Sequence, residues 1–118
     1  MLRIIMKSKI HNATVTEANI NYQGSITIDS ALLKKTDILP GEKVQVINLS
    51  NASRIETYVI EGKDNSGIIC MNGGAAQYAK PGDKLIIVAY ALADSKEATG
   101  FKPKIVIVDA NNKPVKGK

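Results

Sequence analysis

Two nearly identical five-residue segments constrain the fold more than any other feature of this sequence. They are PGEKV at Pro40–Val44 and PGDKL at Pro81–Leu85, 41 residues apart (81 − 40). Pro-Gly followed by an acid is a common turn. Here, however, each copy follows an expected strand and short helix, and each opens a long expected strand. The matching context predicts a duplication, in which two strand–helix–turn–strand units pack about a pseudo-twofold axis.

The remaining pattern is one of short strands with two short helical segments. A helix capped by Asp29 or Ser30 is expected over 31–36, with its leucines facing inward, and a helical turn is expected over 75–79. Strands are expected over 2–6, 9–11, 26–28, 43–49, 55–60, 68–71, 84–92 and 103–108. Mostly short strands, together with short helices that are apolar on one face, are typical of a closed barrel. The sequence therefore predicts a mainly β, six-stranded barrel with short helical inserts.

Length and composition indicate one domain, spanning residues 1–118, with a flexible tail at 111–118. With no Trp and one Phe, the core must be built from aliphatic side chains. The single Cys70 excludes an internal disulfide framework and fits a reducing compartment. No secretion signal and no apolar stretch of membrane-spanning length are visible, so a cytoplasmic protein without membrane contact is expected. The net charge of +5 suits an anionic ligand, either nucleic acid or a small carboxylate.

The dipeptide Gly24-Ser25 opens a β-type run and carries the sharpest chemical hypothesis. Planarity normally protects a peptide bond from attack by a serine hydroxyl. A glycine on the acyl side accepts strained or left-handed backbone at little steric cost. If the fold twists this bond and supplies an oxyanion donor, the acyl group can move from nitrogen to oxygen. Elimination and hydrolysis would then leave a pyruvoyl group at a new N-terminus. Taken alone, the dipeptide is far more often a hairpin corner between two strands.

Two further segments offer polar groups. In the expected strand over 55–60, Arg54, Glu56 and Tyr58 share one face, which could simply be a solvated surface. The segment Asn72–Ala75 presents unhindered N–H groups at the start of a helical turn, suited to a carboxylate or an oxyanion. A plain turn is the alternative there. Metal-ligand spacings, a phosphate loop and a serine–histidine elbow motif are absent, and His11 is the single histidine.

Taken together, four segments resemble the pyruvoyl-dependent aspartate 1-decarboxylases over most of the chain. They are KIH at 9–11, YQGS at 22–25, RIETY at 54–58 and NGGAA at 72–76, at the intervals which that family shows. The resemblance implies a double-psi β-barrel, a homotetramer, and self-cleavage into 1–24 and 25–118. It also implies conversion of L-aspartate to β-alanine for pantothenate and coenzyme A synthesis. The cofactor would be the covalent pyruvoyl group made from Ser25, with neither metal nor pyridoxal phosphate.

The same resemblance assigns roles to individual residues. Ser25 would become the pyruvoyl group and form a Schiff base with the substrate amine, and Tyr58 would protonate the carbanion left by loss of CO₂. Thr57 would donate to the oxyanion of the acyl shift, at the bond between Gly24 and Ser25, and later contact substrate. The other expected substrate-binding residues are Lys9, Arg54, Asn72, Gly73, Gly74 and Ala75, with His11 and Tyr22 in secondary positions.

Two other classes of protein remain open at this stage. A small basic barrel that binds nucleic acid, like the swapped-hairpin transcription regulators, would explain the positive charge. The scarcity of aromatic residues argues against it. A structural oligomer without chemistry is the second alternative. Neither would cleave itself, so the intact mass distinguishes both from a self-processing enzyme.

Overall fold

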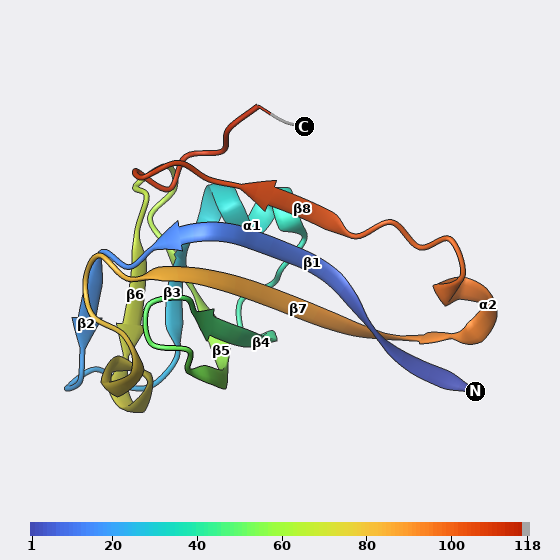
Figure 1. Ribbon diagram of the computed structural model, residues 1–118, viewed down its shortest axis with the longest axis horizontal. Coiled ribbons are helices and arrows are strands. Elements are labelled where there is room, and N and C mark those ends of the chain that lie inside the picture. Colours follow the sequence, from blue (N-terminus) through green and yellow to red (C-terminus); the bar gives the residue numbers. More distant parts are fainter. Residues whose placement is uncertain (117–118) are drawn as a thin grey trace.

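The computed structural model describes residues 1–116, and these residues form one eight-stranded sheet in the order β2-β6-β3-β5-β4-β7-β1-β8 (Figure 1). The strands are β1 (Leu2–Thr14), β2 (Glu17–Asn19), β3 (Ile26–Asp29), β4 (Lys43–Asn48), β5 (Arg54–Gly62), β6 (Ile69–Asn72), β7 (Lys84–Asp94) and β8 (Lys104–Ile107). The helices are α1 (Ser30–Thr36), the 3₁₀ helix η1 (Gly73–Tyr78) and α2 (Ser95–Ala98). The mainly β fold expected from the sequence is confirmed.

The strand pairing has a pseudo-twofold symmetry. In the antiparallel pair β3–β6, Thr27 lies opposite Cys70 at the centre of the paired segment, and a twofold axis through this point exchanges the two neighbouring pairs. In the antiparallel pair β4–β7, Val46 lies opposite Ile87 in the same manner. One axis therefore relates β3, α1 and β4 to β6, η1 and β7, which is the duplication that the repeated segments predict.

The two repeated turns make the same hydrogen bonds. Gly41 N donates to the carbonyl of Val59 at 2.7 Å, and Gly82 N donates to that of Val15 at 2.8 Å. In each case the valine N–H returns a bond to the residue after the glycine. The chain from Val15 into β2 is therefore the counterpart of β5, so each half of the barrel is completed by a strand from elsewhere in the sequence. This interlocked arrangement is a double-psi β-barrel.

The expected six strands correspond to the closed barrel. Five of them are β3, β4, β5, β6 and β7, and the sixth is formed by the end of β1 together with β2, the counterpart of β5. The short strand β8 lies outside this set and pairs with β1. The two expected strands over 2–6 and 9–11 form one continuous strand, β1, with an irregular register between Met6 and Ser8.

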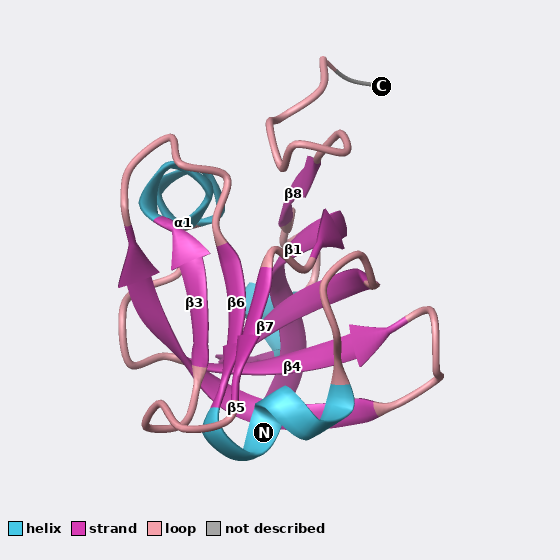
Figure 2. Ribbon diagram, turned by 90° about the vertical axis from the view of Figure 1, so that its left-hand side faces the viewer, coloured by secondary structure: helices cyan, strands magenta, loops and turns pink. Residues whose placement is uncertain are grey.

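The core lies inside the barrel and is aliphatic, as the composition predicts (Figure 2). Its largest fully buried side chains are Ile10, Val15, Ile26, Ile28, Leu32, Val44, Val46, Val59, Ile69, Met71, Leu85 and Ile87. Strand alternation places the strand residues among them on the inner face, while Leu32 comes from α1 and Val15 from the connection between β1 and β2. Apolar side chains also occur outside the barrel, on the long β1–β7 pair that extends from its body (Figure 1). There, Leu2, Ile4 and Leu92 are 65%, 73% and 66% exposed.

The C-terminal segment differs from the expected flexible tail. Asn112 is buried, and its side-chain amide donates to the carbonyls of Thr14 and Gly67 at 2.9 and 2.7 Å while its Oδ1 accepts the N–H of Thr14 at 2.7 Å. Val115 N donates to the carbonyl of Ile107. The chain is therefore attached to the barrel through residue 115, and the last two residues of the expected tail lie outside the described part. Within that part, no helix has the length and apolar character needed to span a membrane.

Candidate active site

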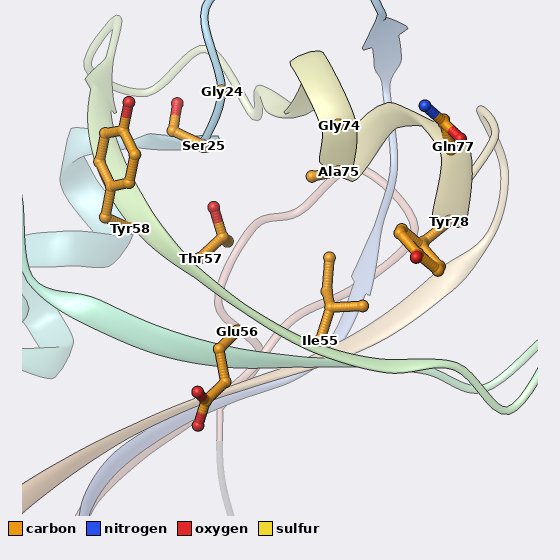
Figure 3. A pocket seen from close by; sticks show the side chains of 10 residues that line it. All are labelled: Gly24, Ser25, Ile55, Glu56, Thr57, Tyr58, Gly74, Ala75, Gln77 and Tyr78. Atoms are coloured by element: carbon orange, nitrogen blue, oxygen red, sulfur yellow. The ribbon is translucent and has the colours of Figure 1, made fainter.

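A pocket of about 620 Å³ opens where the start of β3, the middle of β5 and the helix η1 meet (Figure 3). Its lining residues are Gly24, Ser25, Ile55, Glu56, Thr57, Tyr58, Gly74, Ala75, Gln77 and Tyr78. The parallel pairing of β3 with β5, in which Ile26 lies opposite Val59, brings the Gly24-Ser25 bond next to Thr57 and Tyr58. Two segments that sequence reasoning singled out separately thus share one cavity.

The backbone at the expected cleavage site is unusual. Ser25 has φ of 88° and Gly24 has φ of 21°. Left-handed backbone at a residue with a side chain costs about 1–3 kcal/mol unless the surroundings impose it. Ser25 is also 2% exposed, and its Oγ has no hydrogen-bond partner among the described residues. The hydroxyl is therefore available, and the bond before it is held in a strained conformation.

Three neighbours hold this bond in place. The carbonyl of Ser25 accepts the N–H of Asn72 at 2.9 Å. On one side, the ring of Tyr58 lies so close that a Cβ atom added to Gly24 would be 3.4 Å from its Oη. On the other side, a Cβ atom added to Gly73 would be only 2.6 Å from the nitrogen of Gly24. Figure 3 shows the hydroxyls of Thr57 and Tyr58 on the same side of the pocket as Ser25.

The side chain of Asn72 makes hydrogen bonds to neighbouring strand residues within the barrel. Its Nδ2 donates to Oγ1 of Thr27 at 2.9 Å, and its Oδ1 accepts from Sγ of Cys70 at 3.0 Å. Burial, together with the charge and hydrogen bond of Glu17, raises the pKa of the Cys70 thiol. The thiol therefore keeps its proton at neutral pH and remains a hydrogen-bond donor. In this arrangement the amide of Asn72 faces β3 and not the cleavage bond.

Six of the expected site residues do not line the pocket. Asn72 and Gly73 lie against the Gly24-Ser25 turn through their backbone, and the other four lie elsewhere. Arg54 is exposed and reaches only to Gln45, with Nη1 to Oε1 at 3.4 Å. Lys9 and His11 lie on β1, away from the pocket residues, and Nδ1 of His11 is buried without a partner among the described residues. Tyr22 lines a neighbouring cavity of about 320 Å³, which Tyr58 also lines. No Lys or Arg side chain therefore faces the pocket within the described part of one chain.

Four lining residues were not expected as site residues from the sequence: Ile55, Glu56, Gln77 and Tyr78. Ile55 belongs to the inward face of β5, while Gln77 and Tyr78 come from the end of η1. The sequence carried a signal for η1 itself, but not for the direction in which its last turn points. Among the described residues, no cluster of His, Cys, Asp and Glu has the arrangement of a metal site.

The pocket of this small double-psi barrel thus holds a Gly-Ser turn with left-handed backbone beside the hydroxyls of Thr57 and Tyr58. The family model described as aspartate decarboxylase matches residues 1–115. The chain belongs to the aspartate decarboxylase family. Decarboxylases of this kind are carbon–carbon lyases.

Individual relatives agree with this membership. The chain is 58% identical over 115 residues to "Aspartate 1-decarboxylase" of Thermoanaerobacter pseudethanolicus, covering 98% of each chain. It is 59% identical over 116 residues to the protein of the same name from Carboxydothermus hydrogenoformans, covering 98% of this chain and 91% of the relative. Among solved structures, a computationally designed protein named msDPBB_sym2 matches 75% of this chain and 99% of its own, with 15% identity and a TM-score of 0.45.

Proposed function

We propose that this chain cleaves itself between Gly24 and Ser25 and then converts L-aspartate to β-alanine and CO₂, in the supply of pantothenate and coenzyme A. Family membership supports the decarboxylase activity. The observation that carries the self-processing step is the buried hydroxyl of Ser25, which has no hydrogen-bond partner within residues 1–116 and stands next to left-handed backbone. A buried hydroxyl without a partner is costly, so a site that retains one is a candidate for chemistry.

The self-processing reaction consumes only water, and its atoms and charges balance at each step. The Ser25 hydroxyl attacks the carbonyl carbon of Gly24, the C–N bond breaks, and an ester forms with a free amine on residue 25. Removal of the α-proton of residue 25 then releases Gly24 as a carboxylate and leaves a dehydroalanine. Its imine tautomer is hydrolysed by water, which releases ammonia and leaves a pyruvoyl group. Thr57 would donate to the oxyanion of the first step.

The residues around Ser25 fit such a group. A pyruvoyl carbonyl supplies an electron sink for a carbanion, as pyridoxal does in other decarboxylases. The hydroxyl of Tyr58 lies at the same pocket wall and would give the proton to the substrate carbon. The N–H groups of Gly73 to Ala75 stand at the start of η1 and would donate to a substrate carboxylate.

A second subunit would supply the missing positive charge. Aspartate carries two carboxylates, yet Lys9 and Arg54 do not line the pocket within one chain. We infer a homotetramer in which neighbouring subunits complete each site with these two residues, and with His11 and Tyr22 nearby. The exposed apolar side chains of the β1–β7 pair support such an assembly, because soluble monomers rarely expose contiguous apolar surface. The buried Cys70, unpaired in the described structure, also fits a cytoplasmic enzyme.

Denaturing mass spectrometry tests the self-processing proposal. Purified protein incubated at growth temperature should yield a 24-residue fragment and a 94-residue fragment (118 − 24). The larger fragment should begin with pyruvoyl and resist Edman degradation. Ser25→Ala should remain intact because no hydroxyl is left to attack.

Ser8→Ala is the matched control, because Ser8 also has a buried hydroxyl without a partner among the described residues. That variant should cleave like the wild type. Cleavage of Ser25→Ala at the same bond would overturn the proposal, because a contaminating protease would then be responsible. An intact wild type that still decarboxylates aspartate would equally overturn the assigned cofactor.

A further inference from the structure

The pseudo-twofold axis relates the Gly24-Ser25 turn to a second turn, Gly67-Ile68. Asn72 N donates to the carbonyl of Ser25 at 2.9 Å, and Asp29 N donates to that of Ile68, also at 2.9 Å. Both glycines have positive φ, 21° at Gly24 and 73° at Gly67. The barrel therefore contains two equivalent glycine turns, only one of which has a serine after the glycine.

Hydrogen bonds hold the Gly67 turn on both sides. Its N–H donates to Oδ2 of Asp29 at 2.9 Å, and its carbonyl accepts Nδ2 of Asn112 at 2.7 Å. Asp29 is the N-cap of α1 and also accepts the N–H of Asn65. The backbone of this turn is therefore fixed by buried polar side chains.

The Gly24 turn lacks these bonds. Asn72 occupies the position equivalent to Asp29, but its amide is engaged by Thr27 and Cys70. In the part of the chain that the structure describes, no side chain hydrogen-bonds to Gly24. Apart from the backbone bond of Asn72 to the Ser25 carbonyl, packing must therefore hold this turn.

Gly73, the first residue of η1, packs against this turn. A Cβ atom at this position would lie 2.6 Å from the nitrogen of Gly24, 2.8 Å from its Cα and 2.9 Å from the carbonyl oxygen of Tyr22. Such distances are too short for any real Cβ, and all three atoms belong to backbone, which cannot rotate away. The equivalent position in the other half of the barrel is Ser30, which has a side chain whose Oγ donates to Asp64 at 2.8 Å.

We infer that Gly73 is a positioning residue for self-cleavage: its bare Cα forms the surface against which the Gly24-Ser25 bond is held in its strained conformation. This inference rests on the proposed self-processing of Ser25. A methyl group at residue 73 pushes the backbone of Gly24 outward by several tenths of an ångström. Displacements of that order at a reacting carbon slow a reaction by roughly 10–100-fold.

The test compares the rate of self-cleavage with thermal stability. Freshly refolded Gly73→Ala should fold, as judged by circular dichroism, and should cleave roughly 10–100-fold more slowly than the wild type in denaturing mass spectra. Gly82→Ala is the matched control, because Gly82 has φ of 94° and no heavy atom within 4 Å of an added Cβ. Gly73 itself has φ of 56°, so both variants place alanine in left-handed backbone, but only residue 73 has the contact. The melting temperature of Gly82→Ala should therefore fall while its cleavage rate stays at the wild-type value.

A second variant separates contact from strain at residue 73 itself. Asparagine tolerates left-handed backbone better than alanine, but it places a Cβ at the same point, so Gly73→Asn should also cleave slowly. A folded Gly73→Ala that cleaves at the wild-type rate would overturn the inference, and so would restoration of that rate by Gly73→Asn. Loss of the fold in both variants would overturn it too, because Gly73 would then serve folding and not the bond. An intact wild type would instead contradict the proposed self-processing.

Discussion

Substitution of Asn112 tests whether the C-terminal segment is part of the barrel or a solvated tail. The side chain of Asn112 is 1% exposed and makes three hydrogen bonds, two with Thr14 and one with the carbonyl of Gly67. Its backbone has φ of 59°, which asparagine tolerates and alanine does not. Asn112→Ala should therefore destabilise the protein in two ways.

The expected loss is a large fraction of the stability of a domain of this size. Each hydrogen bond is worth about 1 kcal/mol net, so the three together contribute about 3 kcal/mol. The left-handed backbone adds about 1 kcal/mol for alanine. The free energy of unfolding should thus fall by about 4 kcal/mol, against a typical total of about 5–15 kcal/mol.

Urea denaturation on the Ser25→Ala background measures this difference on one intact chain at one protein concentration. Asn111→Ala is the matched control, because Asn111 is exposed and its side chain makes no hydrogen bond within the described residues. Its free energy of unfolding should stay within about 0.5 kcal/mol of the parent. A loss below about 1 kcal/mol for Asn112→Ala would refute the reasoning and return the segment to the status of a tail.

Three further outcomes are expected. Thr57→Val keeps the shape and loses the hydroxyl, so self-cleavage should stall in mass spectra, whereas Tyr58→Phe should cleave and then decarboxylate aspartate roughly 10²–10⁴-fold more slowly. Wild-type turnover by Tyr58→Phe would contradict its role as proton donor, and an uncleaved Tyr58→Phe would assign that residue to maturation. Hydrogen bonds, first from Asn48 and then from the backbone of Lys80, lower the pKa of Asp83 from 3.8. Its contribution to stability is therefore complete above that pH and is lost as the pH falls through the folded pKa. Asp83→Asn should consequently be less stable at neutral pH and lose less stability on acidification, as measured by urea midpoints. The same dependence of the midpoint on pH in both proteins would exclude Asp83 as the source of the acid sensitivity. Light scattering should report a tetramer of 12.7 kDa chains, and Leu92→Asp should dissociate it; a wild-type monomer at micromolar concentration would contradict the assembly.

Local chemistry was readable from the sequence alone. The repeated PGEKV and PGDKL segments predicted the internal symmetry, because a tight Pro-Gly turn depends on residues adjacent in the chain. The absence of Trp and the abundance of Ile, Val and Leu predicted an aliphatic core. The Gly-Ser dipeptide was also recognisable as a candidate cleavage site from its chemistry, whereas Thr57 and Tyr58 became candidate site residues only through the family resemblance.

Only the tertiary structure decided which of these residues meet. Parallel pairing of β3 with β5 brings Thr57 and Tyr58 to Ser25, and no local pattern encodes a pairing between strands so far apart in the chain. The same holds for Asn112. The Asn, Lys, Pro and Gly residues around it in the sequence predicted a solvated tail, whereas the structure shows long-range hydrogen bonds from its side chain to Thr14 and Gly67. The sequence determined which groups could react, while the barrel determined that one glycine turn is strained against Gly73 and its counterpart is fixed by hydrogen bonds. The physical reason is that backbone strain and steric contact arise between elements, so they exist only once the elements are packed.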